Sequence, residues 1–172
     1  MIIERTLAQY LAGEITGLSV FKDDLAFQIS PKYPYMLTSL IGNKRTGLGA
    51  GINDFHTQTD ETKVFYNESA IRFTFRAIST TEFNGNEIAS LLVRKCDGIL
   101  QGLTHMGGIT LIDSVSQKSV RIAYAEYQSE TDIQTITDKL PPSYQKSISY
   151  LFRIVDLFSI STSSTSIESL SV

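Results

Sequence analysis

The stretch that decides the fold is residues 69–101, SAIRFTFRAISTTEFNGNEIASLLVRKCDGILQ. In its first part, apolar and polar side chains alternate, which is the period of a strand buried on one face. The apolar set is Ile71, Phe73, Phe75 and Ala77, and the polar set between them is Arg72, Thr74 and Arg76. The sequence therefore predicts a strand over residues 69–79 with one core face and one polar face.

The second part of this stretch predicts an amphipathic helix. The Asn84 side chain can accept a hydrogen bond from a free amide of the first helical turn, and Glu87 can reach back to complete a capping box. Apolar residues then recur at helical spacing: Ile88, Leu91, Leu92, Cys96, Ile99 and Leu100. We expect the helix to begin near Gly85 and to end at Gly102, which can adopt the left-handed conformation of a helix end.

Length and composition favour one domain without covalent cross-links. The chain has 172 residues, 15 basic and 18 acidic side chains and a net charge of −3, without long runs of either sign. Such a charge balance supplies no global field toward nucleic acid, and we expect no specific nucleic-acid partner. Cys96 has no second cysteine to pair with, which is compatible with a reducing cytoplasm. No apolar run reaches the roughly 18 residues of a membrane span, so we expect no membrane contact.

Before the deciding stretch, the sequence predicts a helix and short strands. Ile3, Leu7, Tyr10 and Leu11 form a stripe that ends at Gly13 and Gly17. A helix of about three turns is marginal alone, so its stripe must dock on the sheet of its own domain or on a neighbouring subunit. Residues 18–29 and 35–41 predict one or two short strands, separated by prolines.

After the helix, the sequence predicts a loop, a hairpin, a second loop and a closing strand. The loop is residues 103–108, and the hairpin joins residues 109–115 to a strand with Val120, Ile122 and Tyr124 on one face. Residues 128–142 are polar and contain two prolines, which predicts another loop. Residues 148–160 are apolar on both faces, so this strand should lie centrally in the sheet or enter an interface.

The segment from Gly42 to Asp60 is the longest one without periodicity. It contains four glycines and the basic pair Lys44 and Arg45, followed by Phe55 and His56. Long loops in compact domains are usually functional or mobile. A phosphate cradle is one interpretation, but the lysine that a P-loop places after its last glycine is missing; a flexible hairpin extension is the ordinary interpretation.

The sequence shows no recognisable catalytic or metal-binding pattern. His56 and His105 are each alone in loop-like settings, and no nucleophile motif surrounds any serine. We therefore expect no enzyme activity, no cofactor and no metal. The polar face of the strand, with Arg72 and Arg76, is either a solvated surface or a contact surface for another protein. Our candidate interface residues are Lys44, Arg45, Phe55, Arg72, Arg76 and Arg153.

Together these elements predict an α+β fold. We expect one mixed, mostly antiparallel sheet packed against two helices, with a long glycine-rich loop or hairpin extension. Residues 1–160 should form a single domain. Residues 161–172 are mostly Ser and Thr and should form a flexible tail, because they bury too little apolar surface to offset their ordering entropy.

The order of these elements resembles the tail terminator, neck and head–tail joining (tail-completion) proteins of tailed bacteriophages. The resemblance covers residues 2–160 and includes the helix beginning NEIASLL, at residues 86–92, and the closing strand ending in LFRIVDLF, at residues 151–158. The glycine-rich segment and the Ser/Thr tail have lengths that do not match the family pattern.

The resemblance implies a structural virion protein without catalytic residues. Such a subunit assembles with itself into a ring, usually a hexamer, on the head-proximal end of the tail tube. The ring stops polymerisation of the tail tube protein and offers a docking face to the head connector. Localisation in the tail or neck of the virion, after assembly in the host cytoplasm, follows from the same resemblance.

Two other functions stay open at the level of the sequence. A small ligand-binding or enzymatic α+β domain would use the segment from Gly42 to Asp60 as a lid or cradle. The second is a head-side adaptor or minor tail protein of the same particle, which would depend on the same kind of contacts between proteins as the ring-forming subunit.

Overall fold

The computed structural model describes residues 2–22, 32–46, 55–56, 60–137 and 141–161 of the chain. Its two helices are α1 (Ile2–Glu14) and α2 (Gly85–His105). The strands in chain order are β1 (Ser19–Lys22), β2 (Tyr35–Thr46), β3 (Phe55–His56), β4 (Asp60–Ile78), β5 (Ile109–Ile112), β6 (Ser119–Glu130), β7 (Gln134–Ile136) and β8 (Ser143–Ser161).

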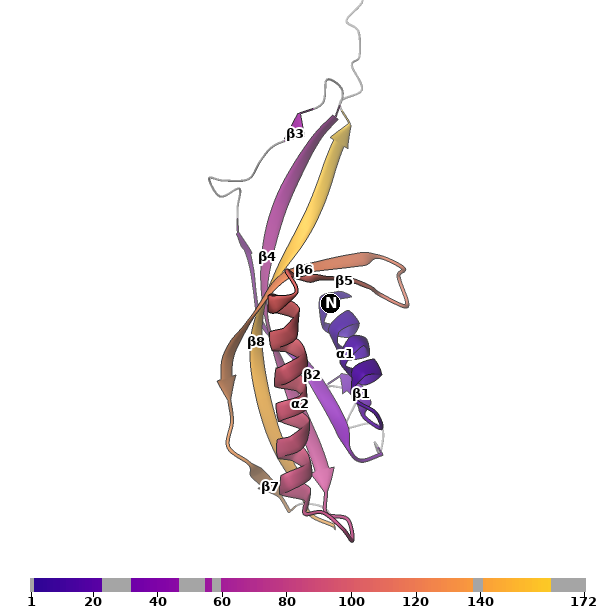
Figure 1. Cartoon of the computed structure of the whole chain (residues 1–172), viewed down its shortest axis with the longest axis vertical. Helices are drawn as coiled ribbons and strands as arrows, with labels where there is room; N and C mark the ends of the chain where they lie inside the picture. Colours follow the sequence, from indigo (N-terminus) through magenta and orange to yellow (C-terminus); the bar gives the residue numbers. More distant parts are fainter. Residues whose placement is uncertain (1, 23–31, 47–54, 57–59, 138–140, 162–172) are drawn as a thin grey trace, which may run out of the picture.

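The strands form one curved, mixed sheet in the order β1-β2-β4-β8-β6-β5 (Figure 1). The β1–β2 pair is parallel and the other pairs are antiparallel, while β3 pairs with β4 and β7 pairs with β8. The predicted α+β fold, with two helices and a mostly antiparallel sheet, is confirmed. The central position predicted for the closing strand is also confirmed, because β8 lies between β4 and β6.

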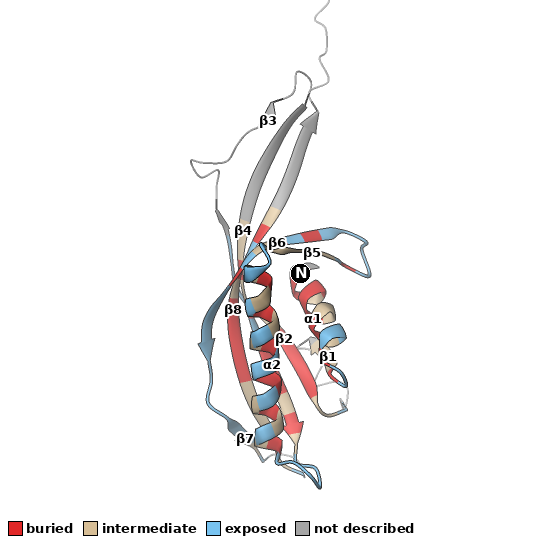
Figure 2. Cartoon of the chain, viewed as in Figure 1, coloured by how far each residue is buried: buried red, intermediate tan, exposed pale blue. Residues whose placement is uncertain are grey.

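The core lies between the two helices and one face of the sheet (Figure 2). Leu7 and Leu11 of α1 are fully buried there, which shows that the first helix docks on the sheet of its own chain. Strand β4 contributes the predicted apolar set, and β8 contributes Ile148, Tyr150, Phe152 and Ile154. The rings of Phe73 and Phe152 meet edge to face at 6.1 Å, so the two longest strands are joined by packing as well as by backbone pairing.

Helix α2 begins as predicted but ends later. Asn84 and Glu87 form the capping box. The helix continues through Gly102 to His105, and the positive φ angles of Gly107 (74°) and Gly108 (93°) redirect the chain afterwards. The predicted end at Gly102 was therefore wrong, and the predicted loop over residues 103–108 was wrong for residues 103–105, whereas residues 106–108 form a turn. Gly102 does not have the positive φ of a helix-ending glycine, whereas Gly107 and Gly108 do.

The region after α2 contains more strand than the sequence indicated. The predicted loop over residues 128–142 was wrong in part, since β6 runs to Glu130 and β7 adds to β8. A register shift between Ile122 and Tyr124 also changes the inward face of β6. Tyr124 is therefore exposed and Ala125 is buried, against the predicted alternation.

Polar contacts fasten α1 to the turn of the β5–β6 hairpin. Arg5 donates two hydrogen bonds to the buried Asp113 carboxylate, at 2.7 and 2.6 Å. Gln9 lies one turn further along α1 and donates to the hydroxyl of Ser114 at 2.7 Å. Two successive turns of the first helix therefore hold the same hairpin turn.

Part of the predicted glycine-rich loop is strand. Gly42 and Lys44 belong to β2, whose pairing with β4 continues to the end of β2 at Thr46. Residues 55–56 form β3 against β4. The rest of the segment, residues 47–54 and 57–59, lies outside the described residues, as does the predicted tail over residues 162–172.

Replacing Gly98 with Ala is expected to stabilise the fold. Gly98 lies in the exposed interior of α2, and a Cβ built on it meets nothing within 4 Å. Alanine loses less backbone entropy in a helix, so unfolding should cost about 0.5–1 kcal/mol more. Urea titration followed by circular dichroism measures this difference, and an unchanged or lower midpoint would contradict it.

Candidate interaction surface

The face of the sheet opposite the helices carries most of the residues that the sequence proposed for an interface. The strand registers place Lys44, Glu68, Arg72, Arg76 and Arg153 on this face, because paired residues of antiparallel strands share a side and Lys44 pairs with Glu68 beyond the register shift in β2. We call this side of β2, β4, β8 and β6 the outer sheet face. The strands thus collect four of the six sequence-predicted interface residues on one surface.

One row of charges crosses three strands of the outer sheet face. Lys44 of β2 is the register partner of Glu68 on β4, and Glu68 is the partner of Arg153 on β8. The Arg153 guanidinium donates to the Glu68 carboxylate at 2.8 Å, and its side chain is 50% exposed. A pair with that exposure is worth little by itself, so its main effect is to hold Arg153 in place.

Arg76 is held within the sheet. Its side chain donates to the amide oxygen of Gln145 at 2.7 Å and to the hydroxyl of Tyr35 at 3.3 Å. Tyr35 is buried between the rings of Phe21 and Tyr33, and burial raises the pKa of its hydroxyl while the hydrogen bond from Arg76 lowers it. Arg76 therefore supports the sheet as much as it offers a charge to a partner, whereas Arg72 is exposed.

The polar set of strand β4 does not all face solvent. Thr74 is only 9% exposed, and its hydroxyl lies 2.9 Å from the hydroxyl of Ser147, its register partner on β8. The sequence pattern does not distinguish this buried pair from a solvated threonine. The exposed basic part of the outer sheet face is therefore centred on Lys44, Arg72 and Arg153.

Two predicted interface residues are located only by their backbone, and one residue was missed. Arg45 belongs to β2 opposite Asn67, and Phe55 belongs to β3 opposite Thr62. Arg121 of β6 lies on the outer sheet face and is exposed, yet it was not among the candidates. The alternation of β6 around Val120 and Ile122 was a signal for it.

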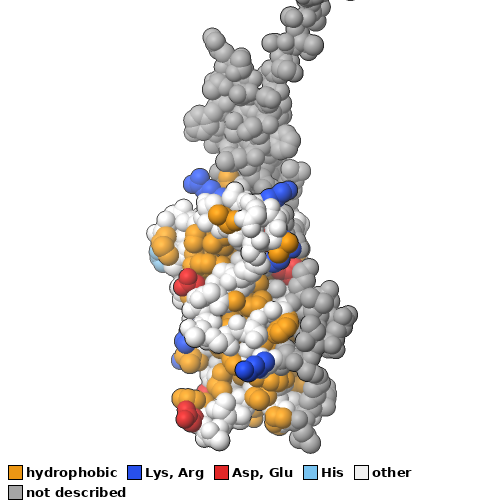
Figure 3. Space-filling model, turned by 90° about the vertical axis from the view of Figure 1, so that its right-hand side faces the viewer, with side chains coloured by type: hydrophobic (Ala, Val, Ile, Leu, Met, Phe, Trp, Pro, Cys, Tyr) orange, Lys and Arg blue, Asp and Glu red, His pale blue; other side chains and the backbone are white. Residues whose placement is uncertain are grey.

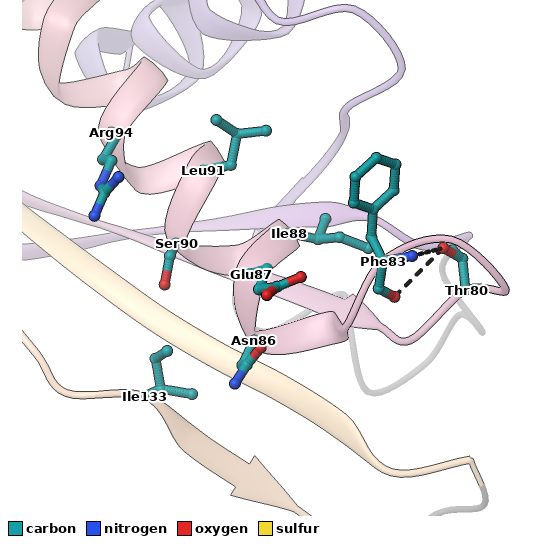
Figure 4. A pocket seen from close by; sticks show the side chains of 9 residues that line it. All are labelled: Thr80, Phe83, Asn86, Glu87, Ile88, Ser90, Leu91, Arg94 and Ile133. Carbon is teal, nitrogen blue, oxygen red and sulfur yellow. Dashed lines mark hydrogen bonds between the residues drawn. The ribbon is translucent and has the colours of Figure 1, made fainter.

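A second surface lies over the outward side of the first turns of α2 (Figure 4). It is an open groove of about 750 Å³. Phe83, Ile88 and Leu91 lie on one side of the helix in this view, and Ile133 lies on the other. Leu91 was predicted to belong to the buried stripe of the helix, but its side chain is 53% exposed, so that assignment was wrong.

The N-terminal end of α2 does not present free amides to this groove. The amide of Gly85 donates to the Ser79 hydroxyl at 3.0 Å, and the amide of Asn86 donates to the Asn84 side chain. The amides of Glu87 and Ile88 donate to the Asn84 carbonyl oxygen. Because these donors are occupied, the groove offers apolar contact and not an anion site.

Two buried groups with a possible chemical role are part of the core. Cys96 is fully buried, and burial raises the pKa of its thiol well above the usual range, which opposes formation of the reactive thiolate. The Tyr150 hydroxyl donates to the Asp97 carboxylate. Burial is the larger cause, and this hydrogen bond the smaller one, that raises the pKa of the phenol. Both groups serve the packing of α2 on β8.

Within the described part of the chain, no three His, Cys, Asp or Glu side chains gather closely enough to bind a metal ion. Among the same residues, no helix has the length and apolar character of a membrane span. No protein-family model and no curated protein matches the sequence.

Proposed function

We propose that this chain is a structural subunit of a tailed-phage particle. It forms a ring at the head-proximal end of the tail tube, ends polymerisation of the tube and provides the docking face for the head connector. The role is architectural and uses no catalytic residue or cofactor. This proposal includes a location in the virion, a closed ring, and the tail tube and the head connector as partners.

The observation that supports the proposal most is the distribution of charge on the outer sheet face. The described basic residues there are Lys44, Arg72, Arg76, Arg121 and Arg153, against the acidic Glu68 and Glu126. The whole chain has a net charge of −3. A positive face on a negative chain fits contact with an acidic protein surface, including a surface of the same kind of subunit.

The shape of the sheet supports a role in assembly. Strands β4 and β8 pair over 19 residues each and run past the ends of both helices (Figure 1). At about 3.3 Å per residue, each strand spans roughly 60 Å. A long, paired arm of this kind can reach beyond its own domain to a neighbouring subunit or to the tube.

The double variant Lys44→Glu/Arg72→Glu is expected to assemble at least about tenfold more weakly, because it reverses two of the exposed positive charges of the outer sheet face. Both side chains are exposed, so the monomer should still fold. Light scattering after size-exclusion chromatography and electron microscopy of mixtures with tail tubes measure ring formation and capping. Arg76 is left in place, because its replacement would also remove hydrogen bonds within the sheet.

The control is Lys32→Glu/Lys95→Glu, which makes the same change in net charge outside the strands of the outer sheet face. It should assemble and cap like the unaltered protein. Equal loss in both variants would mean that total charge matters and not this face. A chain that stays monomeric at high concentration and never caps tubes would refute the proposed function itself.

A further inference from the structure

The turn of the β5–β6 hairpin exposes two aliphatic side chains. Ile112 is 64% exposed and Val115 is 68% exposed. The hairpin extends sideways past α1 (Figure 1), and Figure 3 views the molecule from the side toward which it points, where apolar side chains lie among polar ones. We call Ile112 and Val115 the hairpin tip.

The hairpin tip is fixed before any partner arrives. Besides Arg5, the Asp113 carboxylate accepts hydrogen bonds from the amide of Ser116 at 2.7 Å and from its hydroxyl. The backbone closes the same turn, with the amide of Gln117 donating to the Asp113 carbonyl oxygen at 2.8 Å. A turn ordered in this way loses little conformational entropy on binding, so its aliphatic side chains can act as anchors.

The groove on α2 has the complementary form. Its largest exposed apolar side chains are Phe83 (58%), Leu91 (53%) and Ile133 (38%). Its volume of about 750 Å³ gives room for two aliphatic side chains. Exposed aromatic and aliphatic residues around a concave site are the usual receptors for anchor residues.

The charges beside the two surfaces differ in balance, although the exposed Arg94 also lines the groove. Exposed acidic residues adjoin or line the groove, namely Glu82, Glu87 and Asp132. Two exposed basic residues follow the hairpin tip, namely Lys118 in the turn and Arg121 on β6. Such a pattern favours the approach of a hairpin tip to a groove and disfavours the approach of two grooves to each other.

Within one chain the hairpin tip and the groove cannot meet. The hairpin points sideways at one end of α2, whereas the groove covers the first turns of α2 at its other end (Figures 1 and 4). A contact between two different surfaces of identical chains is head-to-tail, and repetition of such a contact produces a ring or a filament.

We propose that the hairpin tip of one subunit inserts Ile112 and Val115 into the α2 groove of a second copy of this chain. The inference rests on the proposed function, because it names the subunit contact by which the ring would form. The occupant of the groove is therefore the same protein.

Two variants that each lose one of the two surfaces test this contact. Ile112→Asp/Val115→Asp removes the tip, and Phe83→Asp/Leu91→Asp removes the groove. Each variant alone should self-associate at least about tenfold more weakly, since anchor residues commonly contribute 2 kcal/mol or more. An equimolar mixture should form a 1:1 complex and nothing larger, because only one intact tip and one intact groove then remain. Analytical ultracentrifugation measures all three samples.

Met106→Asp is the control, because Met106 is 70% exposed but belongs to neither surface. Thermal melts of all variants show whether each one folds, and folding is expected since every altered position is exposed or faces the groove. If the unaltered chain forms rings that neither variant weakens, or if the mixture forms no complex, this contact is wrong while the proposed function survives. If the unaltered chain is strictly monomeric, both are wrong.

Discussion

Replacing Gly108 with Ala is expected to destabilise the protein by about 2–5 kcal/mol. Gly108 has φ of 93°, which costs an L-residue about 1–2 kcal/mol. A Cβ at this position would also lie 2.3 Å from the carbonyl oxygen of Ile122, well inside van der Waals contact. Since that oxygen belongs to the backbone of β6, the clash is relieved only by moving the strand away from the end of α2.

Gly107→Ala is the matched control for this effect. Gly107 has φ of 74°, but a Cβ built on it meets nothing within 4 Å. This variant should therefore lose only about 1–2 kcal/mol of stability, from backbone strain alone. Chemical denaturation of both variants separates the strain from the clash. Equal losses of stability would show that β6 yields easily and that the close approach of the two elements is not important.

Replacing Asp113 with Asn is expected to lower stability at neutral pH and to weaken its dependence on acid. The hydrogen bonds from Arg5, which have the largest effect, and those from Ser116 hold the pKa of the Asp113 carboxyl well below its ordinary value of about 3.9. A depressed pKa stabilises the fold fully above the unfolded value, and this stabilisation is lost as pH falls toward the folded value. The difference in melting temperature between the two proteins should therefore be constant above about pH 5 and shrink below about pH 4.

Asp132→Asn serves as the comparison, because Asp132 is an exposed carboxylate near the groove. It should melt like the unaltered protein from neutral pH down to about pH 4. Differential scanning calorimetry across this range measures both variants. A difference between Asp113→Asn and the unaltered chain that grows on acidification would contradict the assigned role of the carboxylate. The test also addresses the hairpin tip, since the same carboxylate orders that turn.

The sequence predicted the elements whose signals are local. The alternation in β4 and the capping box of α2 each depend on a few neighbouring residues, and both are present in the structure. The full length of β4 did not follow from its sequence alone, because residues 63–66 are rich in strand-forming residues but only the pairing with β8 shows that they continue into the rest of the strand. The inward face of β6 was missed for a similar reason, since one register shift after Ile122 reverses the alternation.

The candidate surfaces were predictable only as separate residues. Lys44, Glu68 and Arg153 become neighbours through two strand registers, and no spacing in the sequence encodes those registers. The groove was missed because Leu91 fits the helical stripe by period yet falls at its edge, beyond the reach of the sheet. Arg5 and Asp113 are 108 positions apart, and only the fold brings that pair together.

The pairing of β4 with β8 also determines the order in which this chain can be completed during synthesis. Ile78 and Ser143 are the closest partners in sequence along this ladder, and they are 143 − 78 = 65 residues apart. At about 5–20 residues per second, a ribosome needs roughly 3–13 s to supply β8 after β4 has been made. During that interval, Phe73 and Phe75 lie on a strand without its central neighbour, so the nascent chain depends on α1, β2 and α2 to shield that edge from aggregation.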